Sequence, residues 1–200
     1  MRQFRAMDLF LRSRQGVDMY KGYKEVGRVL IDEDELASMT DRLAQEINRD
    51  YSGKEVVFVG LLKGSFIFMS DLIKKITIPC SVDFMIASSY GGRTFSSGEV
   101  NIKKDIGQDI KGKNVIIVED IIDSGITLSA VLAVLEGRQP ESLKLCSLLS
   151  KPARRQKEVR IDYLGTEIPD EFVIGYGLDY DEKYRNIPFV GILDPKYIHD

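Results

Sequence analysis

Apolar and polar residues follow two different periods along the chain, and each period predicts a kind of element. Behind the acidic run 32–35, apolar residues recur at helical spacing and predict an amphipathic helix; they are Leu36, Met39, Leu43, Ala44, Ile47 and Tyr51. Short apolar or alternating runs predict strands: VVFVGLL (56–62), SVDFMIASS (81–89), VNIKKDI (100–106), NVIIVED (114–120) and LKLCSLLS (143–150). Further helices are expected after Lys63-Gly64-Ser65, through Ile76, and over 124–137.

Strands that alternate with helices predict parallel βαβ units in one doubly wound α/β sheet. Beyond Lys151 the chain predicts a small β-rich hood, in which 172–180 and 188–194 frame a short polar helical turn. The sequence shows no internal repeat, linker or low-complexity tract. We therefore expect an N-terminal extension over 1–25 and a single domain over 26–200.

Charge and composition limit the partners that the chain can have. A net charge of −3 and a pI of 5.4 offer no broad positive field for nucleic acid, and KPARRQK (151–157) is the only basic cluster. No apolar run approaches the ~20 residues that span a bilayer. The first residues lack the apolar core and cleavage site of a signal peptide, so a poorly ordered extension is favoured over a transit segment and cytoplasmic residence is expected.

Cysteine and histidine are scarce. Cys80 and Cys146 each lie in an apolar, strand-like run, so buried free thiols are expected rather than a disulfide scaffold or a zinc site. The single histidine, His199, is second from the C-terminus. Histidine-based catalysis and His-rich metal sites are thereby nearly excluded.

The segment VIIVEDIIDSGIT (115–127) carries the most chemical information. Glu119 and Asp120 end a buried strand, and the run from Asp123 to Thr127 turns the chain into a helix. Gly125 permits close approach of a ligand, and the N–H groups at a helix N-terminus can hold a phosphate. The paired carboxylates suit either vicinal ribose hydroxyls or Mg²⁺. Acidic pairs also end strands in phosphate-accepting receiver domains, whereas P-loop and dinucleotide-binding patterns do not match.

From about Val26 to Leu193 the chain resembles the type I phosphoribosyltransferases, and most of all those acting on hypoxanthine and guanine. The matching motifs are LLKGS (61–65), SSY (88–90), EDIIDSGIT (119–127), Lys151 after a strand, and FVIGYGLDYDEKYRN (172–186). The last block discriminates best, since enzymes acting on other bases share the motif that binds phosphoribosyl pyrophosphate (PRPP). Ser124 and Ile126 occupy positions that vary in the family, and the N-terminal extension has no counterpart there.

The resemblance implies roles around the ribose and the two phosphate groups. Glu119 and Asp120 would contact the PRPP ribose directly or through Mg²⁺, and Asp123 would be the general base that takes the N7 proton. The 5′-phosphate would lie on the loop formed by Asp123, Ser124, Gly125, Ile126 and Thr127. Lys63, Gly64 and Arg185 would bind pyrophosphate, with a cis peptide bond between Leu62 and Lys63. The alternative for Lys63 is a surface lysine in a loop between a strand and a helix.

The resemblance also implies three residues that recognise the purine. Lys151 would donate to O6, and Phe172 would stack on the base. The backbone of Val173 would contact the edge of the base. Asp179 would help to hold the second Mg²⁺ near the base. Alone, Lys151 could be a solvated cation and Phe172 a core residue. Ser89 and Tyr90 begin a glycine- and serine-rich stretch (90–99) expected to be a mobile loop over the reacting centre.

The spacing of residues alone indicates a phosphorylated ribose and Mg²⁺, and the resemblance implies an enzyme of purine salvage that converts PRPP and hypoxanthine or guanine into IMP or GMP and pyrophosphate, with Mg²⁺ as cofactor. Its partners would be these small molecules and copies of itself, in a dimer or tetramer, without nucleic acid or membrane. Three alternatives remain: the same chemistry on xanthine, a regulatory protein of this fold that binds RNA or DNA, and a non-catalytic nucleotide-binding module.

Overall fold

A computed structural model describes residues 22–89 and 100–198. The chain divides into two compact units, which are described separately. The larger unit is Ala37–Asp170, and the smaller joins Met1–Leu36 to Glu171–Asp200. Residues 1–21, Tyr90 with the rest of 90–99, and His199 lie outside the described residues, so the extension and the mobile loop remain predictions, as does the boundary at residue 26.

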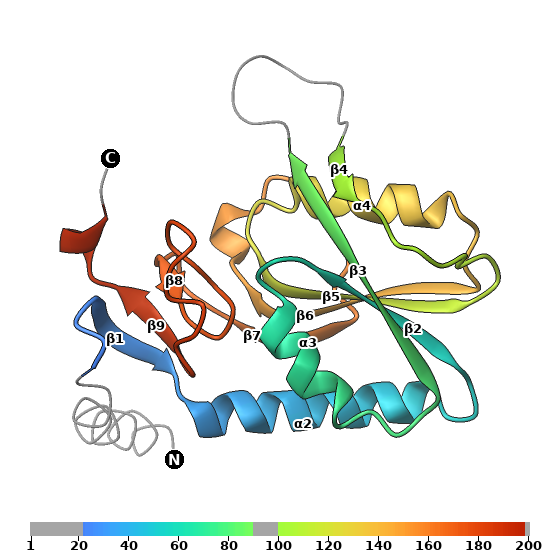
Figure 1. Ribbon diagram of the computed structural model, residues 1–200, viewed down its shortest axis with the longest axis horizontal. Helices are drawn as coiled ribbons and strands as arrows, with labels where there is room; N and C mark the ends of the chain where they lie inside the picture. Colours follow the sequence, from blue (N-terminus) through green and yellow to red (C-terminus); the bar gives the residue numbers. More distant parts are fainter. Residues whose placement is uncertain (1–21, 90–99, 199–200) are drawn as a thin grey trace. The chain divides into compact units, whose positions relative to one another are not determined.

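The larger unit is built on a six-stranded sheet in the order β4-β3-β2-β5-β6-β7 (Figure 1). Neighbouring strands run parallel from β3 to β7, and only β4 is antiparallel, to β3. The strands are β2 (Val56–Leu61), β3 (Cys80–Ser89), β4 (Val100–Lys104), β5 (Asn114–Ile122), β6 (Ser142–Ser150) and β7 (Tyr163–Glu167). The predicted parallel α/β sheet is confirmed, with the predicted strands displaced by a residue or two at their ends.

Helices cover both faces of this sheet. Helix α4 (Ile126–Glu136) lies on one face, and α2 (Glu33–Asp50) and α3 (Phe66–Ile73) lie on the other (Figure 1). Every residue of β2 is buried, and its side chains alternate between the faces. Val57 and Val59 belong to one core cluster with Val131 of α4, whereas the fully buried Phe58 is directed to the opposite side.

The N-terminus of α2 shows why the acidic run before it matters. The Glu35 N–H donates to Asp32 Oδ1 (2.8 Å), and the Asp32 N–H donates to Glu35 Oε2 (3.1 Å). This reciprocal capping box satisfies two N–H groups that the first helical turn leaves without partners.

The strand order changes direction at β2, which has β3 on one side and β5 on the other. Such a switch opens a crevice beyond the carboxyl ends of the two central strands, where ligands of doubly wound sheets bind. Gly60 of β2 lies beside Val118 of β5, so the segments 61–65 and 118–127 leave the sheet next to each other. The topology thus brings together two motifs that lie more than fifty residues apart in the sequence.

The smaller unit contains the antiparallel sheet β1-β9-β8, made of β1 (Val26–Ile31), β9 (Val190–Leu193) and β8 (Val173–Ile174). Its core consists of Ile174, Ile187, Phe189 and Leu193. Tyr23 packs edge-on against Phe189, with ring centroids 5.8 Å apart. The predicted β-rich hood therefore exists as a separate small sheet.

Several details differ from the prediction. Residues 181–187 form turns rather than a helix, because Asp181, Glu182 and Tyr184 have positive φ angles that interrupt a right-handed helix. Strands β1 and β7 were not predicted: β1 joins the small sheet through β9, and β7 extends the large sheet instead of the hood. Cys80 is exposed because β3 starts at the rim of the sheet, whereas Cys146 is buried as expected, and both are free.

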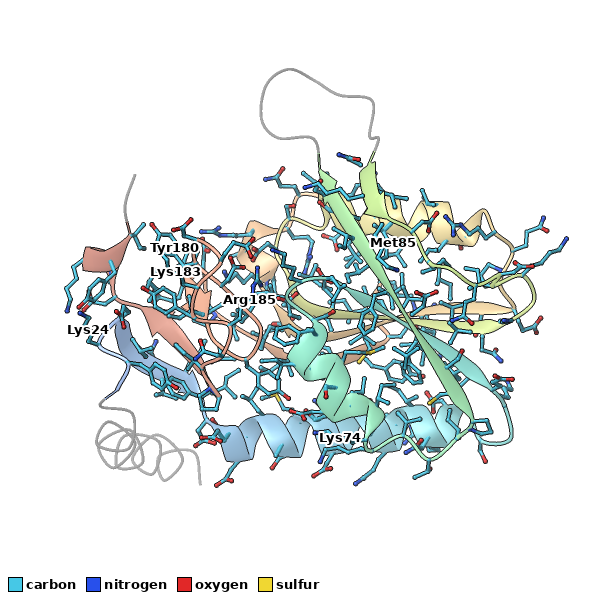
Figure 2. All side chains as sticks on the ribbon, in the orientation of Figure 1. Lys24, Lys74, Met85, Tyr180, Lys183 and Arg185 are labelled. Atoms are coloured by element: carbon cyan, nitrogen blue, oxygen red, sulfur yellow. The ribbon has the colours of Figure 1, made fainter. Side chains whose placement is uncertain are left out.

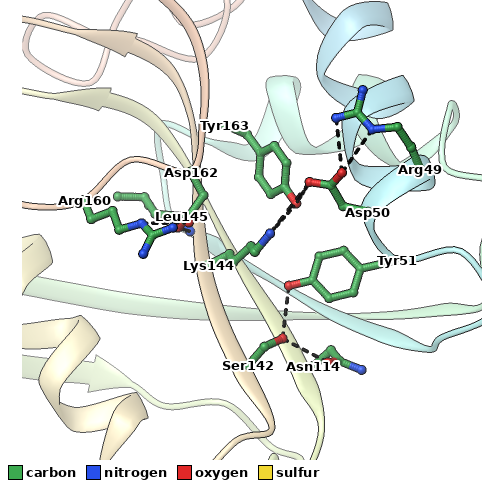
Figure 3. A network of polar contacts seen from close by, with 10 residues as sticks. All are labelled: Arg49, Asp50, Tyr51, Asn114, Ser142, Lys144, Leu145, Arg160, Asp162 and Tyr163. Carbon is green, nitrogen blue, oxygen red and sulfur yellow. Dashed lines mark hydrogen bonds and ion pairs between the residues drawn. The ribbon is translucent and has the colours of Figure 1, made fainter.

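A polar network joins the end of α2 to the amino-terminal ends of the strands (Figure 3). Lys144 Nζ lies 3.0 Å from the hydroxyl of Tyr163 and 5.3 Å from the ring centroid of Tyr51. The Tyr163 hydroxyl donates to Asp50 Oδ2 (3.0 Å). These groups satisfy one another at the edge opposite the carboxyl ends, so we assign them to stability. Within the described ranges, no helix has the length and apolar content needed to cross a membrane.

Candidate active site

Carboxylates gather where β5 ends. Glu119 and Asp120 are among the last residues of β5, and Asp123 follows directly. Glu119 Oε2 is buried without a hydrogen-bond partner. Burial, together with the charges of Asp120 and Asp123, raises the pKa of Glu119 well above its usual value. The strand end is thus an acidic site that a proton, a hydroxyl donor or a cation would stabilise.

Asp120 packs against the end of β2. A Cβ atom on Gly64 would lie 1.8 Å from Asp120 Oδ2, so the carboxylate occupies the space that any side chain at residue 64 would need. The preceding peptide bond, Leu62–Lys63, is cis, as the family resemblance implied. The Ser65 hydroxyl donates to the carbonyl of Leu61 (2.6 Å) and ties the turn to β2.

Gly64→Ala is expected to destabilise the protein by about 1–3 kcal/mol, the usual cost of overpacking, because Asp120 must move to admit the methyl group. Chemical denaturation measures this difference directly. Gly22→Ala is the matched control, since a Cβ there meets no atom within 4 Å. Equal stability of the two variants would contradict the tight Gly64–Asp120 contact.

Asp123 and Lys151 form an ion pair across the ends of β5 and β6. Lys151 Nζ lies 3.4 Å from Asp123 Oδ1, and Lys151 is only 4% exposed. Its backbone N–H donates to the carbonyl of Ile122 (2.9 Å), which fixes its position beside β5. Lys151 is therefore not a solvated loop cation. Its ammonium lies beside the Asp123 carboxylate at the edge of the sheet.

The loop 123–127 leads into α4. Gly125 has a φ of 77°, a left-handed conformation that favours glycine. The Ile126 N–H donates to the Ser124 hydroxyl (3.3 Å), and the Ser129 N–H donates to the carbonyl of Gly125 (2.9 Å). The loop therefore ends at a helix N-terminus with hydroxyl groups from Ser124 and Thr127 nearby in sequence, an arrangement suited to a phosphate.

Three of the four basic residues in the cluster 151–157 have partners within the protein, and the fourth, Lys157, is exposed. Lys151 pairs with Asp123, Arg154 with Asp170, and Arg155 donates to the Ser150 hydroxyl (2.7 Å). The sequence analysis assigned no role to Arg155. Arg155 becomes a candidate for a functional role only because the fold places it close to Gly125 of the loop 123–127.

In the smaller unit, Arg185 and Asp179 lie on one loop and form an ion pair (2.8 Å). The guanidinium also donates to the carbonyl of Gly177 (2.8 Å), and its Nε is buried without a hydrogen-bond partner. Figure 2 shows Arg185 beside Lys183 and Tyr180 on this loop. The same loop thus holds the Arg185 guanidinium and the Asp179 carboxylate next to each other.

Phe172 and Val173 stand at the edge strand of the small sheet. Phe172 is 38% exposed, so it is not a plain core residue, and its ring meets that of Tyr180 edge-on at 5.4 Å. The Leu193 N–H donates to the carbonyl of Phe172 (2.9 Å). Because antiparallel pairing alternates, the N–H and C=O of Val173, which lies opposite Ile192, point away from β9. The exposed ring of Phe172 thus lies next to backbone N–H and C=O groups of Val173 that point away from the sheet.

The structure thus brings Lys63, Gly64, the loop 123–127 and Lys151 to one edge of the large sheet. It brings Phe172, Val173, Asp179 and Arg185 to one part of the smaller unit. Ser89 is the last residue of β3.

Among the residues that the structure describes, no three acidic, histidine or cysteine side chains converge on one point as a metal site. The acidic strand end nevertheless fits Mg²⁺, which is commonly held by one or two carboxylates together with substrate phosphates. The buried, unpartnered Glu119 Oε2 is the observation that supports this fit.

Comparison with known proteins gives consistent matches. The model of the phosphoribosyl transferase domain family matches residues 31–181. A hypoxanthine-guanine phosphoribosyltransferase of Staphylococcus aureus is 47% identical over 174 residues, which cover 87% of this chain and 97% of that protein.

Solved structures of phosphoribosyltransferases are also similar to this chain. A hypoxanthine phosphoribosyltransferase of S. aureus superposes with a TM-score of 0.86 at 46% identity, covering 89% of this chain and 97% of that one. A hypoxanthine-guanine phosphoribosyltransferase of Bacillus anthracis superposes with a TM-score of 0.82 at 47% identity, covering 85% of this chain and 100% of the other.

Proposed function

The chain belongs to the phosphoribosyl transferase family, and on that premise we propose that it transfers the 5-phosphoribosyl group of PRPP to hypoxanthine or guanine in purine salvage. The products are IMP or GMP and pyrophosphate. The observation that carries this proposal is the ion pair of Asp123 with the buried Lys151.

This pair matches one edge of a 6-oxopurine. N7 and O6 are neighbours on that edge of the base. An ammonium has only donors and suits O6, whereas a carboxylate is an acceptor and suits a protonated N7. With the two groups 3.4 Å apart, one protein edge can bind both atoms of the base at once.

In the reaction the bond from C1′ to pyrophosphate breaks, N9 of the base bonds to C1′, and the N7 proton passes to Asp123. Positive charge develops on the ribose and negative charge on the leaving group. Lys63 and Arg185 would hold the pyrophosphate, with Gly64 letting it approach the backbone. The loop 123–127 would hold the 5′-phosphate, and Phe172 with the backbone of Val173 would orient the base.

Mg²⁺ is the proposed cofactor, and it would supply positive charge to the pyrophosphate as it leaves. Glu119 and Asp120 would hold one ion with the ribose hydroxyls. Asp179 would help to hold a second. The buried, unpartnered Oε2 of Glu119 and the nearness of two further carboxylates support this role, because a bound cation would offset their negative charge.

Regulation by RNA or DNA binding is disfavoured, because Lys151, Arg154 and Arg155 of the basic cluster are all engaged within the protein. We further propose that the enzyme is cytoplasmic, where its free cysteines stay reduced, and that it forms a dimer or tetramer. Closure of the segment 90–99 over the site, beginning at Ser89 and Tyr90, would exclude water from the reacting centre.

Steady-state assays with hypoxanthine, guanine, xanthine and adenine, each with PRPP and Mg²⁺, test the function. Turnover of hypoxanthine, guanine or both is expected, with loss of activity when EDTA removes the metal. A protein that uses xanthine alone would instead support the xanthine alternative. Absence of turnover with every base would refute the proposal.

A further inference from the structure

The segment 155–157 packs directly behind the loop 123–127. The N–H groups of Gln156 and Lys157 both donate to the carbonyl of Ser124 (3.0 Å each). The carbonyl of Lys157 lies 2.3 Å from the place where a Cβ atom of Gly125 would be. The backbone of residues 155–157 therefore covers one side of the loop, and a single turn, Pro152–Arg154, separates this segment from Lys151.

Arg155 supplies a charge to this segment. Its Nη2 donates to the hydroxyl of Ser150 (2.7 Å), and Ser150 is 2% exposed. Its Cδ and Nη1 each lie 3.4 Å from the place where a Cβ atom of Gly125 would be. The guanidinium is thus anchored to the end of β6 and lies against the middle of the loop.

Stability alone does not explain this placement. Arg155 Nη1 is buried without a hydrogen-bond partner, and within residues 22–89 and 100–198 no carboxylate lies at ion-pair distance from Arg155. Two carboxylates that pair with other residues of the same basic cluster are engaged elsewhere, Asp123 with Lys151 and Asp170 with Arg154. A buried donor without an acceptor costs free energy, so an unpaired guanidinium here calls for a counter-charge.

We propose that Arg155 is a positioning residue for the phosphate loop, and that the 5′-phosphate of the substrate is its counter-charge. Anchored by Ser150, the guanidinium holds Gly125 in place and adds positive charge behind the amide groups that face the phosphate. Because Arg155 Nη1 is buried, its attraction to a phosphate on the loop is stronger than at a solvated surface. This inference rests on the proposed function, since that function places the phosphate on the loop.

Arg155→Met, which removes the charge and keeps a long side chain, tests the proposal. The KM for PRPP should rise by about 10- to 100-fold, while kcat and the KM for hypoxanthine stay within about threefold. In calorimetry, IMP should lose affinity by a similar factor, whereas inosine, which has no 5′-phosphate, should bind as to the wild type. Arg155→Lys should recover part of the loss, and Ser150→Ala should show a smaller loss in the same direction.

The matched control is Arg154→Met, which removes an equal charge one residue away, from an ion pair with Asp170 on the surface. It should leave the KM for PRPP unchanged. Equal weakening of IMP and inosine by Arg155→Met, or a lower melting temperature with unaltered IMP affinity, would overturn the proposal. A wild type without turnover would overturn the proposed function instead, and the IMP and inosine titrations would still decide the role of Arg155.

Discussion

Asp123→Asn should lower kcat by about 10²- to 10⁴-fold, the usual contribution of a general base, while the protein still folds and binds PRPP. The amide keeps the shape of the side chain, and its oxygen can still face Lys151 Nζ, 3.4 Å away in the wild type. An amide cannot take up the N7 proton, so the base must lose that proton to water. The loss should therefore fall on kcat and kcat/KM rather than on the affinity for PRPP.

Three measurements check this prediction: kcat from initial rates, the affinity for PRPP from calorimetry, and the melting temperature. Asp170→Asn is a suitable control, because it removes a carboxylate that pairs with Arg154 on the surface. A turnover of Asp123→Asn within threefold of the wild type would remove Asp123 from the role of general base.

Adenine should be a very poor substrate, by about 10⁴-fold or more in kcat/KM relative to hypoxanthine, because Lys151 is buried and offers only donors. Its ammonium donates to a 6-oxo group, whereas the 6-amino group of adenine is itself a donor and gives that ammonium N–H no acceptor. Lys151→Gln should reduce this ratio, since an amide can present its carbonyl to an amino group as readily as its NH₂ to an oxygen.

The quantity to compare is the ratio of kcat/KM for hypoxanthine to that for adenine in the two proteins. Absolute rates should fall in Lys151→Gln as well, because Asp123 loses its partner. Lys157→Gln, which changes an exposed lysine of the same segment, should keep the wild-type ratio. If the wild type uses adenine as well as hypoxanthine, or if Lys151→Gln keeps a high ratio, Lys151 does not select the base.

Much of the large sheet could be predicted from sequence because its strands are buried on both faces. The runs 56–62, 114–120 and 143–150 are mainly apolar, a pattern that favours a strand covered on both faces, and they correspond to β2, β5 and β6. The order of chemical groups along 119–127 likewise predicted a turn into a helix, since glycine and hydroxyl residues favour that local geometry.

Local patterns were less informative outside the large sheet. Residues 181–187 carry polar side chains that would suit a helical turn, yet three of them adopt positive φ angles. The loop between β8 and β9 is held instead by contacts such as the pairing of Arg185 with Asp179. Strand β7 was missed because its five residues give little periodicity, and pairing with β6 determines its conformation.

The sequence by itself thus determined which segments become buried strands and which residue types stand at their ends. The positions of these strands depend on interactions between near neighbours and on burial, and both can be inferred from the order of apolar and polar residues. Only the tertiary structure decided which groups meet: the strand order β3-β2-β5-β6 set Asp120 against Gly64, paired Lys151 with Asp123, and put Arg155 behind Gly125. Such contacts join residues far apart in the chain, and no local pattern contains their distances.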